Sequence, residues 1–340
     1  MSVQASIKSE SNLRSRVKFY KKWIDEIQKY LSSQPQEWGR FQSEFNQEVN
    51  GVFRDLMLFE KETIKRGSEE KVYKLKMFFV RWFREDFVRG WYIPHSVKQP
   101  YGYAGDFEII DLIYKNNPNS LGLERLYDNY FQMSAISIAV RNRKEDFKKI
   151  ISNFVQKSPK KNLKIMDLAS GPCRDVYELL CEKHLEPKNV QFDCYDSDPN
   201  SSQYAKQILE SHPSVAFFNQ NAVRIALMRD VAVKIPYKYD VIFSTGLFDY
   251  LDYGVSVRLI SNLKKLLADG GILAISDVRD KFSNPSIYFM EWVAEWNLIY
   301  RPDDEFRNIF LEAGFSRNNL SFDYEQQGVM QYVIAKSDYE

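Results

Sequence analysis

The spacing of apolar residues changes near residue 160 of the chain. Before that point apolar residues recur every three or four positions, which is typical of helices that bury one face. The clearest series is Phe19, Trp23, Ile27 and Leu31. The same pattern continues through 41–56 and 72–88, and it predicts further helices from near Asp106 and over 121–155, the last with a break. Residues 94–105 hold two prolines and two glycines and are expected to form a loop.

After residue 163, short apolar runs alternate with amphipathic segments. The predicted strands are 164–168, 190–195, 215–218, 239–244 and 272–276, the last following a turn at 270–271. The predicted helices between them are 175–184, 200–211 and 255–267. Such alternation indicates a parallel sheet with helices on both faces. Two final strands, 318–324 and 329–335, are joined by a short turn and should pair as an antiparallel hairpin.

These patterns together predict an α/β fold with a helical region in front of it. The sheet is expected to be mostly parallel, with an antiparallel last strand. We place an α-helical N-terminal cap domain at residues 1–157 and the sheet domain at 158–340, with the polar segment 158–162 as the linker.

Composition narrows the possible partners. The formal net charge is +1, which gives no electrostatic case for a nucleic acid or an anionic membrane surface. No apolar run is long enough to span a membrane, and residues 1–10 lack the apolar core of a signal peptide, so a cytoplasmic protein is expected. The three cysteines show no metal-ligand spacing, and His95, His184 and His212 lie far apart in sequence. Metal-free chemistry is therefore the default.

The first strand ends in the segment 167–173 (DLASGPC), where a helix is expected to begin. Small residues there let the backbone approach a ligand, and the helix N-terminus adds partial positive charge. We expect Asp167, Ala169 and Gly171 to contact this ligand. A dinucleotide site would have a third glycine where this chain has Arg174, which argues against a bound pyrophosphate. A strand–turn–helix with a merely structural glycine is the alternative.

The second strand also ends in acidic residues, within the segment 196–199 (DSDP). A carboxylate at the tip of this strand is placed to accept hydrogen bonds from both hydroxyls of a ribose. Asp196 is the better candidate because it directly follows the strand, and Ser197 is its neighbour. Asp198 is placed instead to cap the helix that Pro199 opens. Two ordinary turn aspartates are the alternative.

In this order and on these strands, the segments resemble the class I methyltransferases that use S-adenosylmethionine, over about residues 160–336. The resemblance implies a Rossmann-like sheet that binds S-adenosylmethionine at the carboxyl ends of its strands. It implies an adenine contact for Asn221, where the family more often has Asp, and for the small residue Ala222. The end of the fourth strand, Ser244, Thr245 and Gly246, would lie near the methionine part of the cofactor.

Three further segments carry a finer resemblance. They are 100–108 (PYGYAGDFE), 246–250 (GLFDY) and 290–301 (MEWVAEWNLIYR). They look like the bacterial 3-hydroxypalmitic acid methyl ester biosynthesis proteins, over most of the chain beyond about residue 90. Tyr101 and Tyr103 could then offer a hydroxyl and aromatic surface to the cofactor's sulfonium, although the loop could instead only pack the cap onto the sheet domain. Arg143 could pair with the cofactor's carboxylate or with an acidic substrate. The alternative is an ordinary surface arginine.

The expected reaction is methyl transfer to a small molecule that is acidic and partly apolar. A carboxylate is already ionised at neutral pH, so its methylation needs no general base. No catalytic residue is fixed by the pattern, and Asp249 and Tyr250 are the candidates. The segment 288–301, read as a helix, would line an apolar substrate site with Tyr288, Trp292 and Trp296 and end in Arg301, which could bind a carboxylate.

Alternatives to this reading remain open. For the segment 288–301, a core role is the alternative, because aromatic stripes at helical spacing are usually core. For the whole chain, the alternatives are methylation of another small molecule or a protein, and a regulatory protein that binds the cofactor without catalysis. A homodimer is possible.

Overall fold

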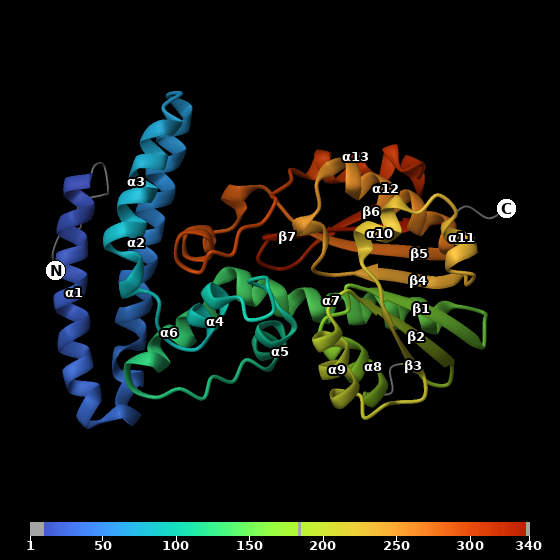
Figure 1. Cartoon of the computed structure of the whole chain (residues 1–340), viewed down its shortest axis with the longest axis horizontal. Helices are drawn as coiled ribbons and strands as arrows, with labels where there is room; N and C mark the ends of the chain where they lie inside the picture. The colour runs from blue at the N-terminus through green and yellow to red at the C-terminus, as the bar shows by residue number, and fades with distance from the viewer. Residues whose placement is uncertain (1–9, 183–184, 338–340) are drawn as a thin grey trace. The chain divides into compact units, whose positions relative to one another are not determined.

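Amphipathic helices build the first part of the chain in the computed structural model, which describes residues 10–182 and 185–337 (Figure 1). Their bounds are α1 Glu10–Ser33, α2 Gly39–Lys65, α3 Glu69–Trp82, α4 Tyr92–Lys98, α5 Phe107–Lys115 and α6 Gly122–Met133. Within the series predicted for α1, Ile27 and Leu31 are buried. Phe19 is 51% exposed and does not belong to the buried face.

The segment predicted as a loop at 94–105 is helical in its first part. Helix α4 runs through Pro94, which sits in the first turn, where a missing backbone N–H breaks no helical hydrogen bond. The helix ends at Lys98, and the following C-cap residue Gln99 has a left-handed φ of 46°. The helix start predicted near Asp106 is confirmed, because the Asp106 carboxylate caps α5 by accepting from the backbone N–H groups of Glu108 and Ile109.

A seven-stranded sheet forms the second part of the chain, in the order β3-β2-β1-β4-β5-β7-β6. The strands are β1 Asn162–Leu168, β2 Asn189–Asp196, β3 Val215–Asn219, β4 Tyr239–Ser244, β5 Leu267–Val278, β6 Leu320–Tyr324 and β7 Met330–Lys336. Strands β1 to β5 pair in parallel, and β7 is antiparallel to both β5 and β6. The predicted sheet, mostly parallel with an antiparallel end, is confirmed.

The glycine pair predicted as a turn at 270–271 lies inside β5 instead. The register between β4 and β5 shifts beside it, so the strand absorbs the glycines as an irregularity rather than ending there. Gly271 allows a close backbone approach, since a Cβ built on it would stand 2.8 Å from the carbonyl oxygen of Ala268 and 3.0 Å from that of Tyr239.

Helices cover both faces of the sheet (Figure 1). Their bounds are α7 Ala135–Lys157, α8 Arg174–Cys181, α9 Pro199–Ile208, α10 Ala222–Leu227, α11 Val231–Lys234, α12 Tyr253–Leu266 and α13 Asp303–Glu312. Neighbouring residues of β4 separate the two faces. Ile242 belongs to the core shared with α10, α12 and α13, whereas the ring of Phe243 contacts that of Phe147 on α7.

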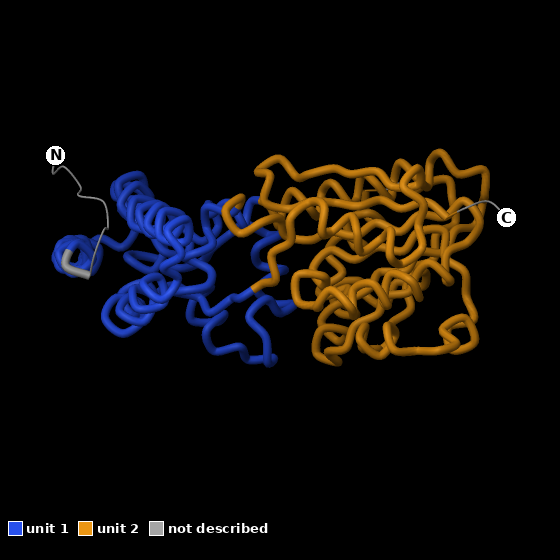
Figure 2. Tube along the Cα trace, turned by 90° about the horizontal axis from the view of Figure 1, so that it is seen from above, with its two compact units in different colours: residues 1–138, 284–297 blue, residues 139–283, 298–340 orange. Residues whose placement is uncertain are grey.

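The chain divides into two compact units (Figure 2). Unit 1 comprises Met1–Ile138 and Asn284–Asn297, and unit 2 comprises Ala139–Ser283 and Leu298–Glu340. Nearly all of α7 therefore belongs with the sheet, and a segment that follows β5 belongs with the helices. The domain boundary expected at 157/158 is not tested by this division and stays a prediction.

The segment 284–297 is an insertion of the sheet that completes the helical unit. Phe289 packs against Phe53 of α2, and Trp292 packs edge-on against Phe79 of α3. The single long helix expected over 288–301 does not form. A π-helix covers only Phe289–Val293, and Glu295 then takes a left-handed φ of 55°.

Every helix within residues 10–182 and 185–337 is too short or too polar to cross a bilayer.

Candidate functional site

The loop between β1 and α8 has an unusual backbone. Three of its residues take left-handed angles: Ala169 (φ 57°), Gly171 (φ 53°) and Cys173 (φ 50°). Such angles cost energy in residues other than glycine, and clustered strain of this kind is common where a loop is shaped for a ligand. Around Gly171 the space is open, because a Cβ built there would meet nothing within 4 Å. The predicted small-residue loop thus has room for a ligand to approach.

Asp196 lies beside this loop at the tip of β2, as the sequence predicts. Its Oδ2 accepts from the backbone N–H of Gly171 at 2.8 Å and from the Ser201 hydroxyl at 3.3 Å, and its Oδ1 accepts from the N–H of Asp198 at 2.9 Å. Burial raises the pKa of Asp196, while the two backbone hydrogen bonds oppose that rise. The carboxylate both shapes the loop and keeps lone pairs for further donors.

Asp167 is the penultimate residue of β1, just before the loop, and is 2% exposed. Its Oδ2 is buried and has no hydrogen-bond partner among the described residues. Burial raises the pKa of this carboxyl well above its ordinary value, and the nearby Asp175, Cys173 and Asp196 raise it further. A buried carboxylate without a partner is unfavourable, so Asp167 is expected to be protonated or to bind a cation.

The end of β4 is tied to its neighbours through side-chain hydroxyls. Ser244 donates to the backbone carbonyl of Leu168 at 2.7 Å, which joins the tips of β4 and β1. Ser276 of β5 donates to the carbonyl of Thr245 at 3.0 Å. The order of the sheet reverses between β1 and β4, and ligands of parallel α/β sheets bind at such a switch point.

Arg143 projects from α7 against this same end of β4. A Cβ built on Gly246 would lie 3.4 Å from its Nη2, so the absence of a side chain there makes room for the guanidinium. Arg143 is 4% exposed, and its Nε has no hydrogen-bond partner among the described residues. Its ion pair with Asp249 is long, at 3.9 Å between Nη1 and Oδ2. A buried cation that is so weakly paired is suited to binding an anion.

Asp249 and Arg301 belong to a buried polar cluster behind Arg143. Asp249 accepts from the backbone N–H of Val278 at 2.9 Å. Burial raises the pKa of the neighbouring Asp277 well above its ordinary value, and the nearby Asp249 raises it further. Arg301 donates to Asp277 at 3.0 Å and to the carbonyl of Phe248 at 2.9 Å, and is itself fully buried.

Several predicted residues have local structural partners. The side-chain oxygen of Asn221, expected to hold an adenine, caps α10 by accepting from the N–H groups of Val223 and Arg224. Ala222 is buried, and Ser197 and Tyr250 are exposed. The capping function of Asn221 uses the oxygen assigned to adenine, so its contact with the cofactor stays a prediction.

The remaining predicted residues lie in unit 1. The ring of Tyr101 packs at a tilt against that of Phe107, with ring centroids 4.5 Å apart, and Tyr103 is in the same loop. The hydroxyl of Tyr288 donates to Glu60 at 2.5 Å inside the helical unit. Trp292 and Trp296 are buried there as well. Tyr288, Trp292 and Trp296 are therefore buried in unit 1 as core residues, whereas Arg301 lies in unit 2. The helical face that was predicted to carry all four side chains does not form.

Two local arrangements were not visible in the sequence spacing. The carboxylate of Asp167 and the thiols of Cys173 and Cys194 lie within 4.8 Å of one another, which is the geometry of a potential metal site within the described part of the chain. In unit 1, His95 Nε2 lies 2.7 Å from the buried Asp106. Parallel pairing of β1 with β2 brings Asp167 opposite Cys194, a contact that strand alternation could have suggested.

His184 is outside the described residues. Metal-free chemistry stays a prediction.

No family model and no curated protein sequence matches this chain. Solved structures do resemble it. A possible exported protein of Bordetella parapertussis matches with a TM-score of 0.57 and 18% sequence identity, over 77% of this chain and 82% of that one. An O-methyltransferase family protein of Burkholderia thailandensis matches with a TM-score of 0.45 and 15% identity, over 60% of each chain.

A magnesium protoporphyrin IX methyltransferase of Synechocystis, solved with bound S-adenosylmethionine, matches with a TM-score of 0.42 and 13% identity, over 60% of this chain and 84% of that one. At such identities the likeness concerns the fold alone. Unit 2 has a Rossmann-like fold, with the strand order and the antiparallel last strand described above.

Proposed function

We propose that this protein is a methyltransferase that uses S-adenosylmethionine, bound at the carboxyl ends of β1, β2 and β4. When bound, the cofactor supplies an electrophilic methyl group on a sulfonium. The observation that carries the proposal is that two buried side chains, an acid and a base, each have an atom without a hydrogen-bond partner among the described residues: Oδ2 of Asp167 and Nε of Arg143.

These two groups match the amino-acid end of the cofactor. That end carries an α-ammonium and an α-carboxylate, so it would give a cation to Asp167 and an anion to Arg143. Asp167 is the penultimate residue of β1, and Arg143 lies against Gly246 just beyond β4, the neighbouring strand. Both groups are almost completely buried, which makes an ionic hydrogen bond to either one stronger than it would be at the surface.

The neighbouring strand tip suits the nucleoside end. Asp196 is held in place by backbone N–H groups and can still accept from ribose hydroxyls. The open space at Gly171 leaves the loop backbone accessible. Arg174 occupies the position at which a dinucleotide-binding loop has its third glycine. The loop is therefore less suited to a pyrophosphate than to a nucleoside without phosphate.

For the acceptor, we propose the carboxylate of a small acid with an apolar part, such as a fatty-acid-like molecule. A carboxylate attacks the methyl group without losing a proton first, so this chemistry needs no general base. The finer resemblance to the 3-hydroxypalmitic acid methyl ester biosynthesis proteins in the segments 100–108 and 246–250 supports this choice.

The test is turnover of S-adenosylmethionine by the full chain with a panel of acids of increasing chain length, each paired with the alcohol of the same length. We expect S-adenosylhomocysteine and a methyl ester, detected by mass spectrometry, with the acids only. Products from the alcohols alone would contradict the carboxylate acceptor but support the methyltransferase. Cofactor binding without any turnover across acids, alcohols and proteins would favour a regulatory protein.

A further inference from the structure

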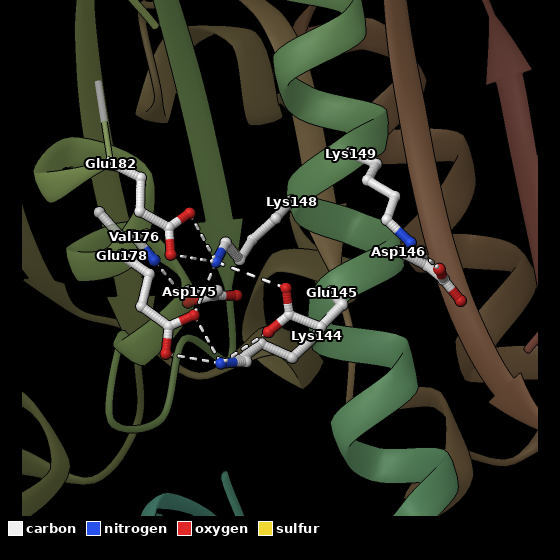
Figure 3. Close-up of polar contacts among 9 residues, drawn as sticks. All are labelled: Lys144, Glu145, Asp146, Lys148, Lys149, Asp175, Val176, Glu178 and Glu182. Atoms are coloured by element: carbon white, nitrogen blue, oxygen red, sulfur yellow. Dashed lines mark hydrogen bonds and ion pairs between the residues drawn. The ribbon is translucent and has the colours of Figure 1, made fainter. Parts of the chain in front are cut away.

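A network of buried lysines joins α7 to α8 beside the candidate cofactor site (Figure 3). Lys144 and Lys148 are one turn apart on α7, and each is only 5% exposed. Lysine is rarely buried unless its charge is paired, so both ammonium groups are expected to have carboxylate partners. Both project toward the carboxylates of α8.

Glu178 is the centre of the network. Its carboxylate accepts from Lys144 at 2.6 and 2.5 Å and from Lys148 at 2.8 Å. Lys148 also donates to Glu182 at 2.9 Å, at the end of α8. Glu145 approaches from α7 itself, at 3.0 Å from Lys144 and 3.5 Å from Lys148. We call this set of five residues the lysine clamp.

The clamp connects two parts of the candidate site: helix α7, which carries Arg143, and the loop that leads into α8. Arg143 directly precedes Lys144 on α7, so the clamp fixes the helix that presents the guanidinium. Helix α8 begins at Arg174, directly after the loop 169–173, so the clamp also fixes the element in which that loop ends. Residues one helical turn apart hold a helix in rotation as well as in position.

We infer that Lys144 and Lys148 are positioning residues that set the spacing between Arg143 and the loop 169–173, and thereby the affinity for the cofactor. The inference rests on the proposed function, because it concerns that same cofactor site. A ligand that bridges two elements binds more tightly when their spacing is already set, since less freedom is lost on binding. Loosening the clamp should therefore weaken binding without removing any group that touches the ligand.

The test is calorimetric titration of S-adenosylhomocysteine into the full chain and its variants. Lys148→Met removes the charge but keeps most of the unbranched side chain, and we expect the dissociation constant to rise about tenfold, within the range for residues coupled through one network. A second variant exchanges the charges, Lys148→Glu with Glu182→Lys. This double variant should bind more tightly than Lys148→Glu alone and come within about threefold of the native chain.

Lys149 supplies a matched control on the same helix. It pairs with Asp146 at 3.2 Å away from the clamp, and its side chain is 65% exposed (Figure 3). Lys149→Glu should leave the dissociation constant within about twofold of the native value. This control separates an effect of the clamp from a general effect of charge on α7.

The outcomes distinguish the inference from the proposed function. If the native chain does not bind S-adenosylhomocysteine, the proposed function fails and the inference fails with it. If the native chain binds and Lys148→Met binds equally well, only the inference is overturned. A lower melting temperature with unchanged affinity would likewise overturn it, because the clamp would then stabilise the fold without positioning the site. Rescue of affinity by the charge exchange would support it.

Discussion

Buried carboxyl groups distinguish the candidate site at the scale of single residues. Asp175 lies in the first turn of α8 and is 6% exposed. Its pKa is raised from 3.8 to about 6, mainly by burial, while its hydrogen bond from the Val176 N–H and the charge of Lys144 lower it. The native state therefore binds this proton more tightly than the unfolded chain does, and stability is lost as the pH rises from about 4 to above 6.

Replacing Asp175 by Asn should remove this pH dependence. Above about pH 7 the variant should be more stable than the native chain, by up to about 3 kcal/mol, because no buried charge has to be kept. Near pH 4 the two should be equal. Urea unfolding at pH 8 and pH 4 measures the difference. If the native chain and the Asp175→Asn variant were equally stable at pH 8, the ionised Asp175 carboxylate would not destabilise the native fold.

Sequence spacing located some site residues and not others, for a physical reason. Asp196 and Gly171 were predicted because both follow buried strands, and parallel strands bring their carboxyl ends to one edge. Arg143 was predicted with alternatives, since nothing in the pattern showed that its Nε is buried without a partner. Burial and pairing of a single side chain depend on distant segments, which periodicity does not reveal.

At the scale of elements, β5 is where the sequence is most misleading. Its glycine pair has the signature of a turn, but the strand continues because Gly271 must let the carbonyls of Ala268 and Tyr239 approach. Gly271→Ala should destabilise the protein by about 1–3 kcal/mol, the usual cost of forcing extra atoms into packed structure. Urea unfolding measures this loss.

Gly254 gives the matched control for that substitution. It lies in the first turn of α12, where a Cβ would stand 3.5 Å from the nearest side-chain atom, an ordinary contact. Gly254→Ala should be neutral or slightly stabilising, because alanine is the better helix former. If both variants lost the same stability, the tight fit at Gly271 would not be the cause.

The other elements show where periodicity succeeds. Strand β4 matches its predicted bounds, since its apolar residues 241–243 and the flanking residues of the strand are all buried, as expected for a parallel strand covered on both faces. Helices α10, α11 and α13 were not predicted, and two of them are too short to show a helical period. The segment 288–301 has helical spacing, yet it forms only a short π-helix within unit 1.

At the scale of the whole molecule, the helical unit is completed by the insertion 284–297, which lies between β5 and α13 in the chain. Residues 139–340 alone would leave Phe289 and Trp292 without Phe53 and Phe79 to pack against. We expect this truncated chain to aggregate, because it exposes a contiguous apolar patch. Size-exclusion chromatography measures the outcome.

Replacing 284–297 in that truncated chain by a short Gly/Ser linker should restore a monodisperse protein, since the apolar side chains leave with the insertion. If the truncated chain were already monodisperse with the insertion present, the insertion would not need the helical unit. The sequence suggested a helical first part but not this exchange of segments, because an insertion and the elements that bury it are far apart along the chain.

The most direct test of the account is titration of S-adenosylhomocysteine into the native chain, Asp167→Asn and Arg143→Gln, with melting temperatures measured in parallel. The native chain should bind at one site. Each variant should bind about 10–100-fold more weakly, as expected for the loss of a hydrogen bond to a charged group, and remain folded. Asp167→Asn should not lower the melting temperature, because it removes an unpaired buried carboxyl. No binding by the native chain, or native affinity in both folded variants, would contradict the proposed cofactor site.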